Sequence, residues 1–147
     1  MRKTVFLLLI GVFFLFGGCA ENKEDNMNQE LLNYCKNNDT VTLSDITKFN
    51  WDVAYLDYQV YGQGENLKNT YGITGKFEGL NSEEQFAIAF CKNGKLVKYS
   101  ICNWLDIMFG ETLPSDDKQI VVIYPNDIFT VKWKQDEMRN KSTLYLL

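Results

Sequence analysis

The sequence predicts an α+β domain with an antiparallel sheet of about four to five strands and one or two short helices. Two hydrophobic runs of period two flank Asn93-Gly94, a β-branched run occupies residues 119–124, and residues 65–71 have helical spacing. The chain has 147 residues, of which 46% are hydrophobic. This length and composition fit one folded domain of ordinary size.

The strongest local prediction is a β-hairpin of residues 85–92 and 95–103. Asn93-Gly94 supplies the two positive φ angles of a type I′ turn. A two-residue loop would place residue 90 opposite 97, 88 opposite 99 and 86 opposite 101. Large apolar side chains would then share one face, and small ones such as Ala87 and Ala89 the other, which suits a packed helix or partial exposure.

Before the hairpin, residues 29–37 could form a short helix with Leu31, Leu32 and Cys35 on one side, or they could be a frayed leader. Residues 40–42 could form a short strand. Within residues 41–61, apolar side chains of both parities predict a strand that is covered on both faces. Residues 65–71 predict a short helix that ends at Gly72.

After the hairpin, residues 104–117 are expected to form a loop. Residues 119–124 and 128–134 predict two strands joined by a turn at Pro125-Asn126-Asp127. The polar stretch from Glu137 ends in Leu-Tyr-Leu-Leu, which could dock as a last strand or hang free.

The first eighteen residues have the layout of a secretory signal peptide. Arg2 and Lys3 precede an apolar run from Val5 to Phe16, and small residues follow. The segment from Val5 to Gly18 is shorter than the ~20 residues that a membrane-spanning helix needs. We therefore expect residues 1–18 to be removed.

Cys19 follows Gly17-Gly18, an arrangement that resembles the lipobox of bacterial lipoproteins. The resemblance implies acylation of the Cys19 sulfur and cleavage just before it, although Phe16 stands where the usual pattern has Leu. The alternative is ordinary cleavage after Ala20, which would leave Cys19 unexplained. We expect lipidation at Cys19, a tether with a possible short helix over residues 19–39, and one α+β domain over residues 40–147.

Charge and composition exclude several classes of function. The formal charge is −4, and removal of Arg2 and Lys3 leaves 13 basic against 19 acidic residues, or −6. An acidic chain argues against nucleic-acid binding. The absence of His excludes Ser-His-Asp and Cys-His catalysis and imidazole metal ligands. Arg139 is the one Arg that remains, too few for a phosphate clamp.

Cysteine spacing favours buried thiols over disulfides. In the expected register Cys91 and Cys102 lie about 20 Å apart, at ~3.3 Å per residue, which excludes a bond between them. Cys35 could still pair with one of them, but three buried apolar side chains are the preferred interpretation. The sequence holds no metal-binding motif, and we expect no metal and no cofactor.

Two further sets of residues are candidates for function. Asp52 and Asp57 lie within an aromatic stretch and are the best available acids for a hydrolase. Aromatic side chains could line a groove for a peptide or sugar, although large aromatics more often form the core of a small domain. The candidate surface consists of Trp51, Tyr55, Tyr58, Tyr61 and Trp104, with Trp133 as a further aromatic.

Three segments together resemble a family of small bacterial proteins of unknown function, often secreted or lipoprotein-like. They are Phe49-Asn-Trp-Asp-x-x-Tyr55, the segment ending Tyr71-Gly-Ile73, and the Lys92-Asn-Gly-Lys95 hairpin. The resemblance covers residues 40–134 and implies fold and location, without catalytic residues.

These observations predict a lipid-anchored, extracytoplasmic bacterial protein with a non-catalytic domain that binds an envelope protein or a small ligand. The alternatives are an envelope hydrolase that uses acidic residues, and a small inhibitor or immunity-type protein. A shared pocket for Asp52 and Asp57 would favour the hydrolase, and an exposed aromatic patch would favour the binding domain.

Overall fold

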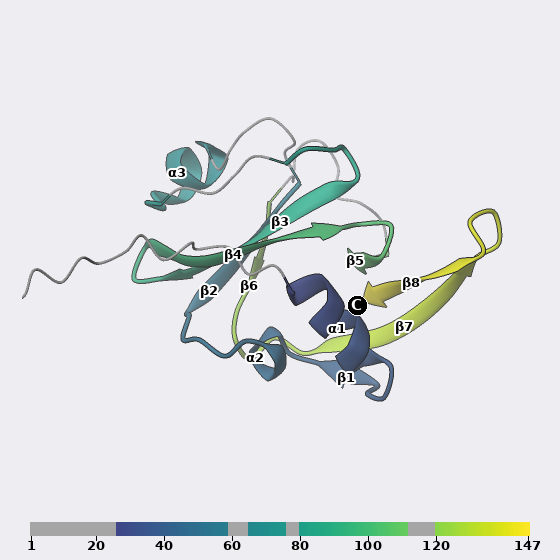
Figure 1. Ribbon diagram of the computed structural model, residues 1–147. Coiled ribbons are helices and arrows are strands. Elements are labelled where there is room, and N and C mark those ends of the chain that lie inside the picture. Colours follow the sequence, from purple (N-terminus) through teal and green to yellow (C-terminus); the bar gives the residue numbers. More distant parts are fainter. Residues whose placement is uncertain (1–25, 59–64, 76–79, 112–119) are drawn as a thin grey trace, which may run out of the picture.

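The computed structural model describes residues 26–58, 65–75, 80–111 and 120–147 (Figure 1). These residues form an α+β fold of three short helices and two four-stranded sheets. The elements are α1 (Met27–Cys35), β1 (Thr40–Val41), α2 (Leu43–Ile46), β2 (Val53–Asp57), α3 (Glu65–Tyr71), β3 (Gln85–Lys92), β4 (Lys95–Asn103), β5 (Ile107–Phe109), β6 (Ile120–Ile123), β7 (Phe129–Asp136) and β8 (Lys141–Leu146).

The first sheet has the antiparallel order β4-β3-β2-β6. Its β3–β4 hairpin turns at Asn93 and Gly94, whose φ angles of 50° and 71° confirm the predicted turn. The predicted register holds beside the turn but is wrong beyond it, because a bulge shifts the pairing between Cys91 and Phe90. Phe90 therefore faces Lys98, and Phe86 faces Cys102.

The second sheet has the order β1-β7-β8-β5, in which β5 runs parallel to β8 and the other pairs are antiparallel. The predicted α+β class with an antiparallel sheet is confirmed, and the second four-stranded sheet adds to the single sheet that the sequence predicts. The sequence predicts β6 and β7 as two consecutive strands joined by a turn. In the structure they belong to different sheets. Of the two alternatives for the C-terminal stretch, a last strand or a free end, the structure shows the strand, β8.

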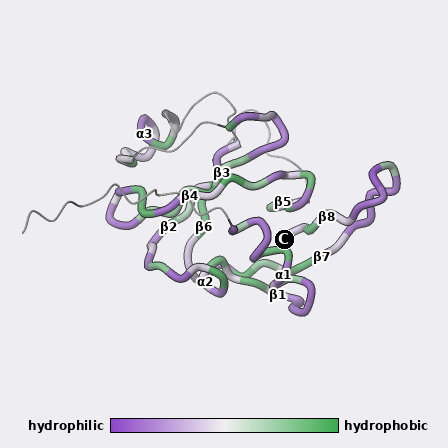
Figure 2. The backbone as a smooth tube through the Cα atoms, in the orientation of Figure 1, coloured by the Kyte–Doolittle hydropathy of each residue, from purple (hydrophilic) through white to green (hydrophobic). Residues whose placement is uncertain are grey.

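The main core lies between the two sheets and α1. Phe86, Ile88 and Phe90 of β3 share it with Leu144 of β8, and all four are fully buried. Met27, Leu31 and Cys35 point from α1 into the same core, so the helix is an integral part of the fold and no frayed leader. Figure 2 shows hydrophobic segments at these central positions and mainly hydrophilic colour over the outer end of the β7–β8 hairpin.

The other face of the first sheet carries α3. Leu67 of this helix packs with Ala89, Cys91 and Tyr55 in a second, smaller cluster. The small side chains on this face of β3 allow the helix to approach, as the alternation predicted. Gly72 follows the helix with φ of 66°, the left-handed conformation expected at a helix end.

Two short elements were missed by the sequence interpretation. α2 begins with a capping box in which Thr42 and Asp45 bond reciprocally, a pattern that the sequence contains as Thr-x-x-Asp. β5 lies within the expected loop of residues 104–117 and pairs with β8. Residues 112–119, with part of that loop, lie outside the described part of the chain.

Candidate functional site

The structure distributes the predicted aromatic residues among several environments. Trp51 and Tyr55 are each only 8% exposed. The Trp51 indole N–H donates to Thr47 Oγ1 at 2.9 Å, and its ring meets Phe90 edge to face. These two side chains therefore belong to the cores, which corrects their assignment to a binding surface.

Tyr58 and Trp104 are half-buried against the main core. The Tyr58 ring stacks on Phe86 with 5.0 Å between centroids, and burial raises the pKa of its phenol, offset in part by a hydrogen bond with the Phe109 backbone. The Trp104 indole N–H donates to the Glu83 carbonyl oxygen at 2.8 Å. Both rings therefore tie segments together. Tyr61 lies outside the described residues, as does Cys19.

Asp52 and Asp57 are not brought together. Asp52 is exposed, and its Oδ2 accepts a hydrogen bond of 2.8 Å from the Asn93 backbone N–H, so it braces the hairpin turn. Asp57 is 2% exposed and lies at the far end of β2. Asp52 precedes β2, and the two residues are five positions apart, about 16 Å at ~3.3 Å per residue. At that separation the two carboxylates form no catalytic dyad.

The cysteines of the described residues, Cys35, Cys91 and Cys102, are free and buried, which rules out a disulfide for Cys35 with either of the others. Burial raises the pKa of the Cys35 thiol to about 11 and those of Cys91 and Cys102 to about 12. Thiols with such pKa values hold very little thiolate at neutral pH and react slowly.

Within the part of the chain that the structure describes, no three cysteine or carboxylate side chains gather into a group that could hold a metal ion. No helix there combines the length and apolar character that a membrane span requires.

The most prominent surface feature is the β7–β8 hairpin, which projects away from the body of the molecule (Figure 1). Residues 132–135 of β7 are all exposed, so this part of the strand is open to solvent on both faces. Of the five exposed large hydrophobic residues in the described ranges, four lie in this hairpin or the turn before it. They are Tyr124, Ile128, Trp133 and Met138.

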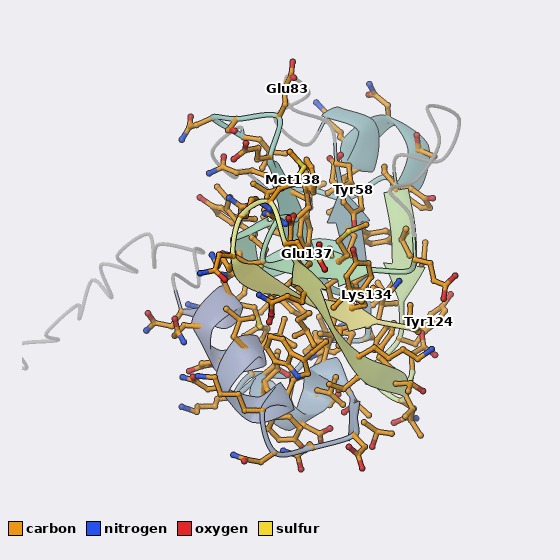
Figure 3. The ribbon with its side chains drawn as sticks, turned by 90° about the vertical axis from the view of Figure 1, so that its right-hand side faces the viewer. Tyr58, Glu83, Tyr124, Lys134, Glu137 and Met138 are labelled. Atoms are coloured by element: carbon orange, nitrogen blue, oxygen red, sulfur yellow. The ribbon has the colours of Figure 1, made fainter. Side chains whose placement is uncertain are left out.

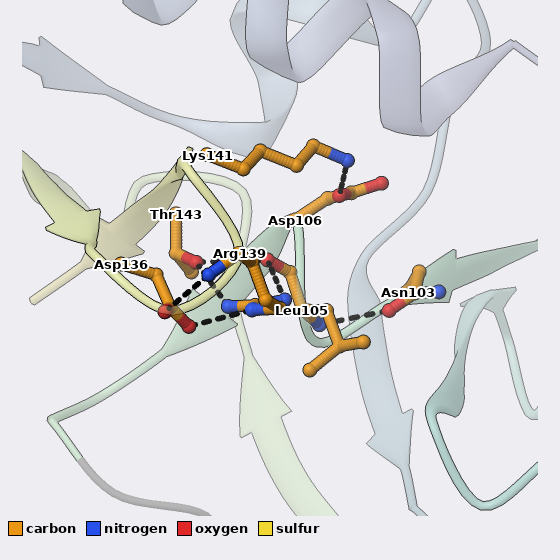
Figure 4. Close-up of polar contacts among 7 residues, drawn as sticks. All are labelled: Asn103, Leu105, Asp106, Asp136, Arg139, Lys141 and Thr143. Atoms are coloured by element: carbon orange, nitrogen blue, oxygen red, sulfur yellow. Dashed lines mark hydrogen bonds and ion pairs between the residues drawn. The ribbon is translucent and has the colours of Figure 1, made fainter.

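The end of the hairpin is held in place by Arg139. Its guanidinium bonds to Asp136 Oδ2 at 2.5 Å, to Thr143 Oγ1 at 3.2 Å and to the Leu105 carbonyl oxygen at 3.4 Å (Figure 4). The hydrogen bonds from Arg139 hold the pKa of Asp136 below its usual range. This network joins the β7–β8 turn to the β4–β5 turn, and so orders a segment that could otherwise fray.

The ordered turn presents one bare apolar side chain. Met138 is 98% exposed beside Glu137, and Figure 3 shows both at the end of the hairpin, with Lys134 farther along β7. The Lys134 ammonium lies 4.2 Å from the centre of the Tyr145 ring, a cation–π contact across the two strands. Because the turn is already ordered, a partner that binds the exposed thioether of Met138 would cost little conformational entropy. Such a site suits recognition.

The sequence interpretation included Trp133 among the aromatics but did not single out this hairpin. The available signal was the alternation of Lys132, Trp133 and Lys134, which is polar enough to indicate an exposed strand. Comparisons with protein-family models, with curated proteins and with solved structures found no match to this chain.

Proposed function

We propose that this chain is an extracytoplasmic bacterial lipoprotein whose domain is a non-catalytic binding module. The location is supported by the positive start, the short apolar run and Cys19 directly after Gly17-Gly18. Two or more acyl chains give a stable membrane anchor, because each buried CH₂ contributes about 0.8 kcal/mol.

The observation that carries the binding role is the projecting β7–β8 hairpin. It combines four consecutive exposed residues, an ordered turn and the bare Met138 side chain. Exposed apolar residues on a preorganised element are typical of interaction sites. The hydrolase alternative depended on Asp52 and Asp57, and the separation between Asp52, which precedes β2, and Asp57, at its end, withdraws that support.

The anchor is tested by Cys19→Ala in the producing cell, with Cys35→Ala as a control that also removes one thiol but keeps the lipidation site. Only Cys19→Ala should lose metabolic labelling by a palmitate analogue, and it should leave the membrane fraction or remain unprocessed. The mass of the processed wild type should fit acylated Cys19 as its first residue. A first residue of Glu21 would instead show ordinary cleavage.

The binding role is tested by photocrosslinking on intact cells. A photoreactive residue replaces Met138 at the hairpin end or, as a matched exposed control, Lys68 on α3. A discrete adduct that forms from position 138 and is absent from position 68 supports the hairpin as the interaction element. Equal adducts from both positions, or none from 138, contradict it.

A further inference from the structure

The hydrogen-bond pattern of β7 shows which backbone groups point away from its neighbour β8. Thr130 and Leu147 exchange both backbone hydrogen bonds, at 2.7 and 3.0 Å. In an antiparallel ladder the pattern alternates, so residues 132, 134 and 136 also turn toward β8, and residues 131, 133 and 135 turn away. The Val131 N–H accordingly donates to the Asp39 carbonyl oxygen at 2.9 Å, on the β1 side.

The strand that covers this side of β7 ends early. β1 pairs only with Phe129 and Thr130, and the chain before it curls back to α1, where Asn38 Nδ2 donates to the Tyr34 carbonyl oxygen. Among the described residues no strand continues beside Trp133 and Gln135. Their backbone N–H and C=O groups therefore form an open sheet edge, in the stretch of β7 that is exposed on both faces.

Side chains define the two faces of this edge. The Trp133 ring is 40% exposed, and its indole N–H donates to the Cys35 carbonyl oxygen at 3.2 Å, which holds the ring beside the edge. On the opposite face stand Lys132 and Lys134, while the nearby Asp136 is paired with Arg139. The Lys134 ammonium lies 4.2 Å from the centre of the Tyr145 ring of β8, and it would have to swing from that ring to reach a strand added at the edge. An added strand would thus meet an aromatic ring on one face and two lysine side chains on the other.

Charge decides between the possible occupants. The hairpin from Phe129 to Leu146 carries four basic and two acidic side chains, a net of +2 in a chain of net −4. If the β7 strands of two copies paired antiparallel through this edge, at least one of Lys132 and Lys134 would stand opposite a lysine in each register that pairs residue 133 with residue 131, 133 or 135, and like charges opposite each other are destabilising. An acidic strand would meet opposite charge at the same positions.

We propose that the open edge of β7 at Trp133 and Gln135 takes an extended acidic segment of a partner protein by strand addition. Acidic residues of the segment face Lys132 and Lys134, and its alternate apolar residues pack on the Trp133 ring. Main-chain hydrogen bonds hold the strand, and the alternation of side chains sets its specificity. This assignment rests on the proposed binding role and names the chemistry of its partner.

The test uses the protein as cells process it, purified in nonionic detergent micelles. The probe is a pool of eight-residue acetylated peptides with Glu at every second position and Val, Ile, Thr or Tyr between, and the control pool has Lys in place of Glu. The Glu pool should bind at least tenfold more tightly than the Lys pool and weaken with salt. Hydrogen exchange should slow at residues 131–136 and nowhere else.

Two variants separate strand addition from general adhesion. Gln135→Pro removes the outward N–H and leaves the main-chain bonds to β8, and should weaken binding of the Glu pool tenfold or more. Like Gln135→Ala, it also loses the side-chain hydrogen bond that Ser142 Oγ donates to Gln135 Oε1 at 2.9 Å, so the alanine variant controls for that loss. Gln135→Ala keeps that N–H and should stay within twofold of wild type. The double change Lys132→Glu with Lys134→Glu should reverse the preference between pools, and it keeps the test valid if Gln135→Pro does not fold.

Several results would overturn the proposal. They are no binding of the Glu pool, equal binding of both pools, protection outside β7, or concentration-dependent dimerisation that protects residues 133 and 135 without peptide. Binding of the peptides elsewhere on the domain would contradict only the assignment of the site to the edge of β7, and the proposed binding role would stand. The lipid anchor is tested independently, by whether Cys19→Ala leaves the membrane fraction.

Discussion

Truncation of Leu31 tests whether α1 is part of the folded domain. Leu31 is fully buried in the main core, at the middle of the helix. Leu→Ala changes at such sites cost 2–5 kcal/mol, because transfer free energy is lost and a cavity remains. We expect Leu31→Ala to lower the free energy of unfolding by about 3 kcal/mol. With a urea m-value of ~1.5 kcal/mol/M, the midpoint falls by about 2 M.

The assay is a urea titration of the processed protein followed by tryptophan fluorescence, in which the buried Trp51 reports on the core. Gln29→Ala is the matched control on the exposed side of the same helix, where the Gln29 side chain donates to Asn33 Oδ1 at 3.1 Å. Its free energy of unfolding should stay within ~0.5 kcal/mol of wild type. If Leu31→Ala behaves like this control, α1 does not pack as described.

Three further predictions follow from local features. The three buried thiols should resist iodoacetamide at pH 8 and react once urea unfolds the chain, since burial raises their pKa values; rapid native labelling would contradict this. Because Asp136 has a lowered pKa, its bond to Arg139 is present above the ordinary carboxyl pKa and is lost as pH falls through the lowered value. Hydrogen exchange at residues 137–140 should therefore accelerate in acid in the wild type, and should be fast and insensitive to pH, after correction for intrinsic rates, in Asp136→Asn. Gly94→Ala places a side chain at φ of 71° with nothing within 4 Å, and should cost about 1 kcal/mol of backbone strain. Gly75→Ala should cost more in the same urea titration, because its Cβ would lie 2.5 Å from Leu96 Cβ; equal costs would contradict this steric argument.

The sequence predicted those features that depend on neighbouring residues. The β3–β4 turn follows from Asn93-Gly94, and α3 from its spacing and Gly72. The bulge beyond Cys91 could not be predicted, because the hydrophobic pattern of each strand is compatible with either register. β5 was missed because three residues carry too little periodicity and the parallel partner β8 lies more than thirty residues away.

The candidate site illustrates the same limit. β2 is apolar on both faces, so its sequence could not tell that Trp51 and Tyr55 face two separate cores instead of a groove. Trp133 lies between lysines, yet its exposure depends on where β1 ends, and that is a property of the second sheet. Burial of an aromatic residue is thus decided by contacts between distant segments.

With Cys19 acylated as proposed, the burial of Met27 would limit how far the domain can move from a bilayer. Met27 is fully buried at the start of α1, and the proposed acylated residue, Cys19, lies only eight residues earlier. Eight residues span at most about 28 Å, at ~3.3–3.6 Å each. The proposed anchor would therefore confine the domain to a thin layer at the membrane. Partners anchored in the same membrane would meet it within that layer, at a local concentration above that in free solution. A contact of only a few main-chain hydrogen bonds, too weak to persist between freely diffusing molecules, can be maintained there.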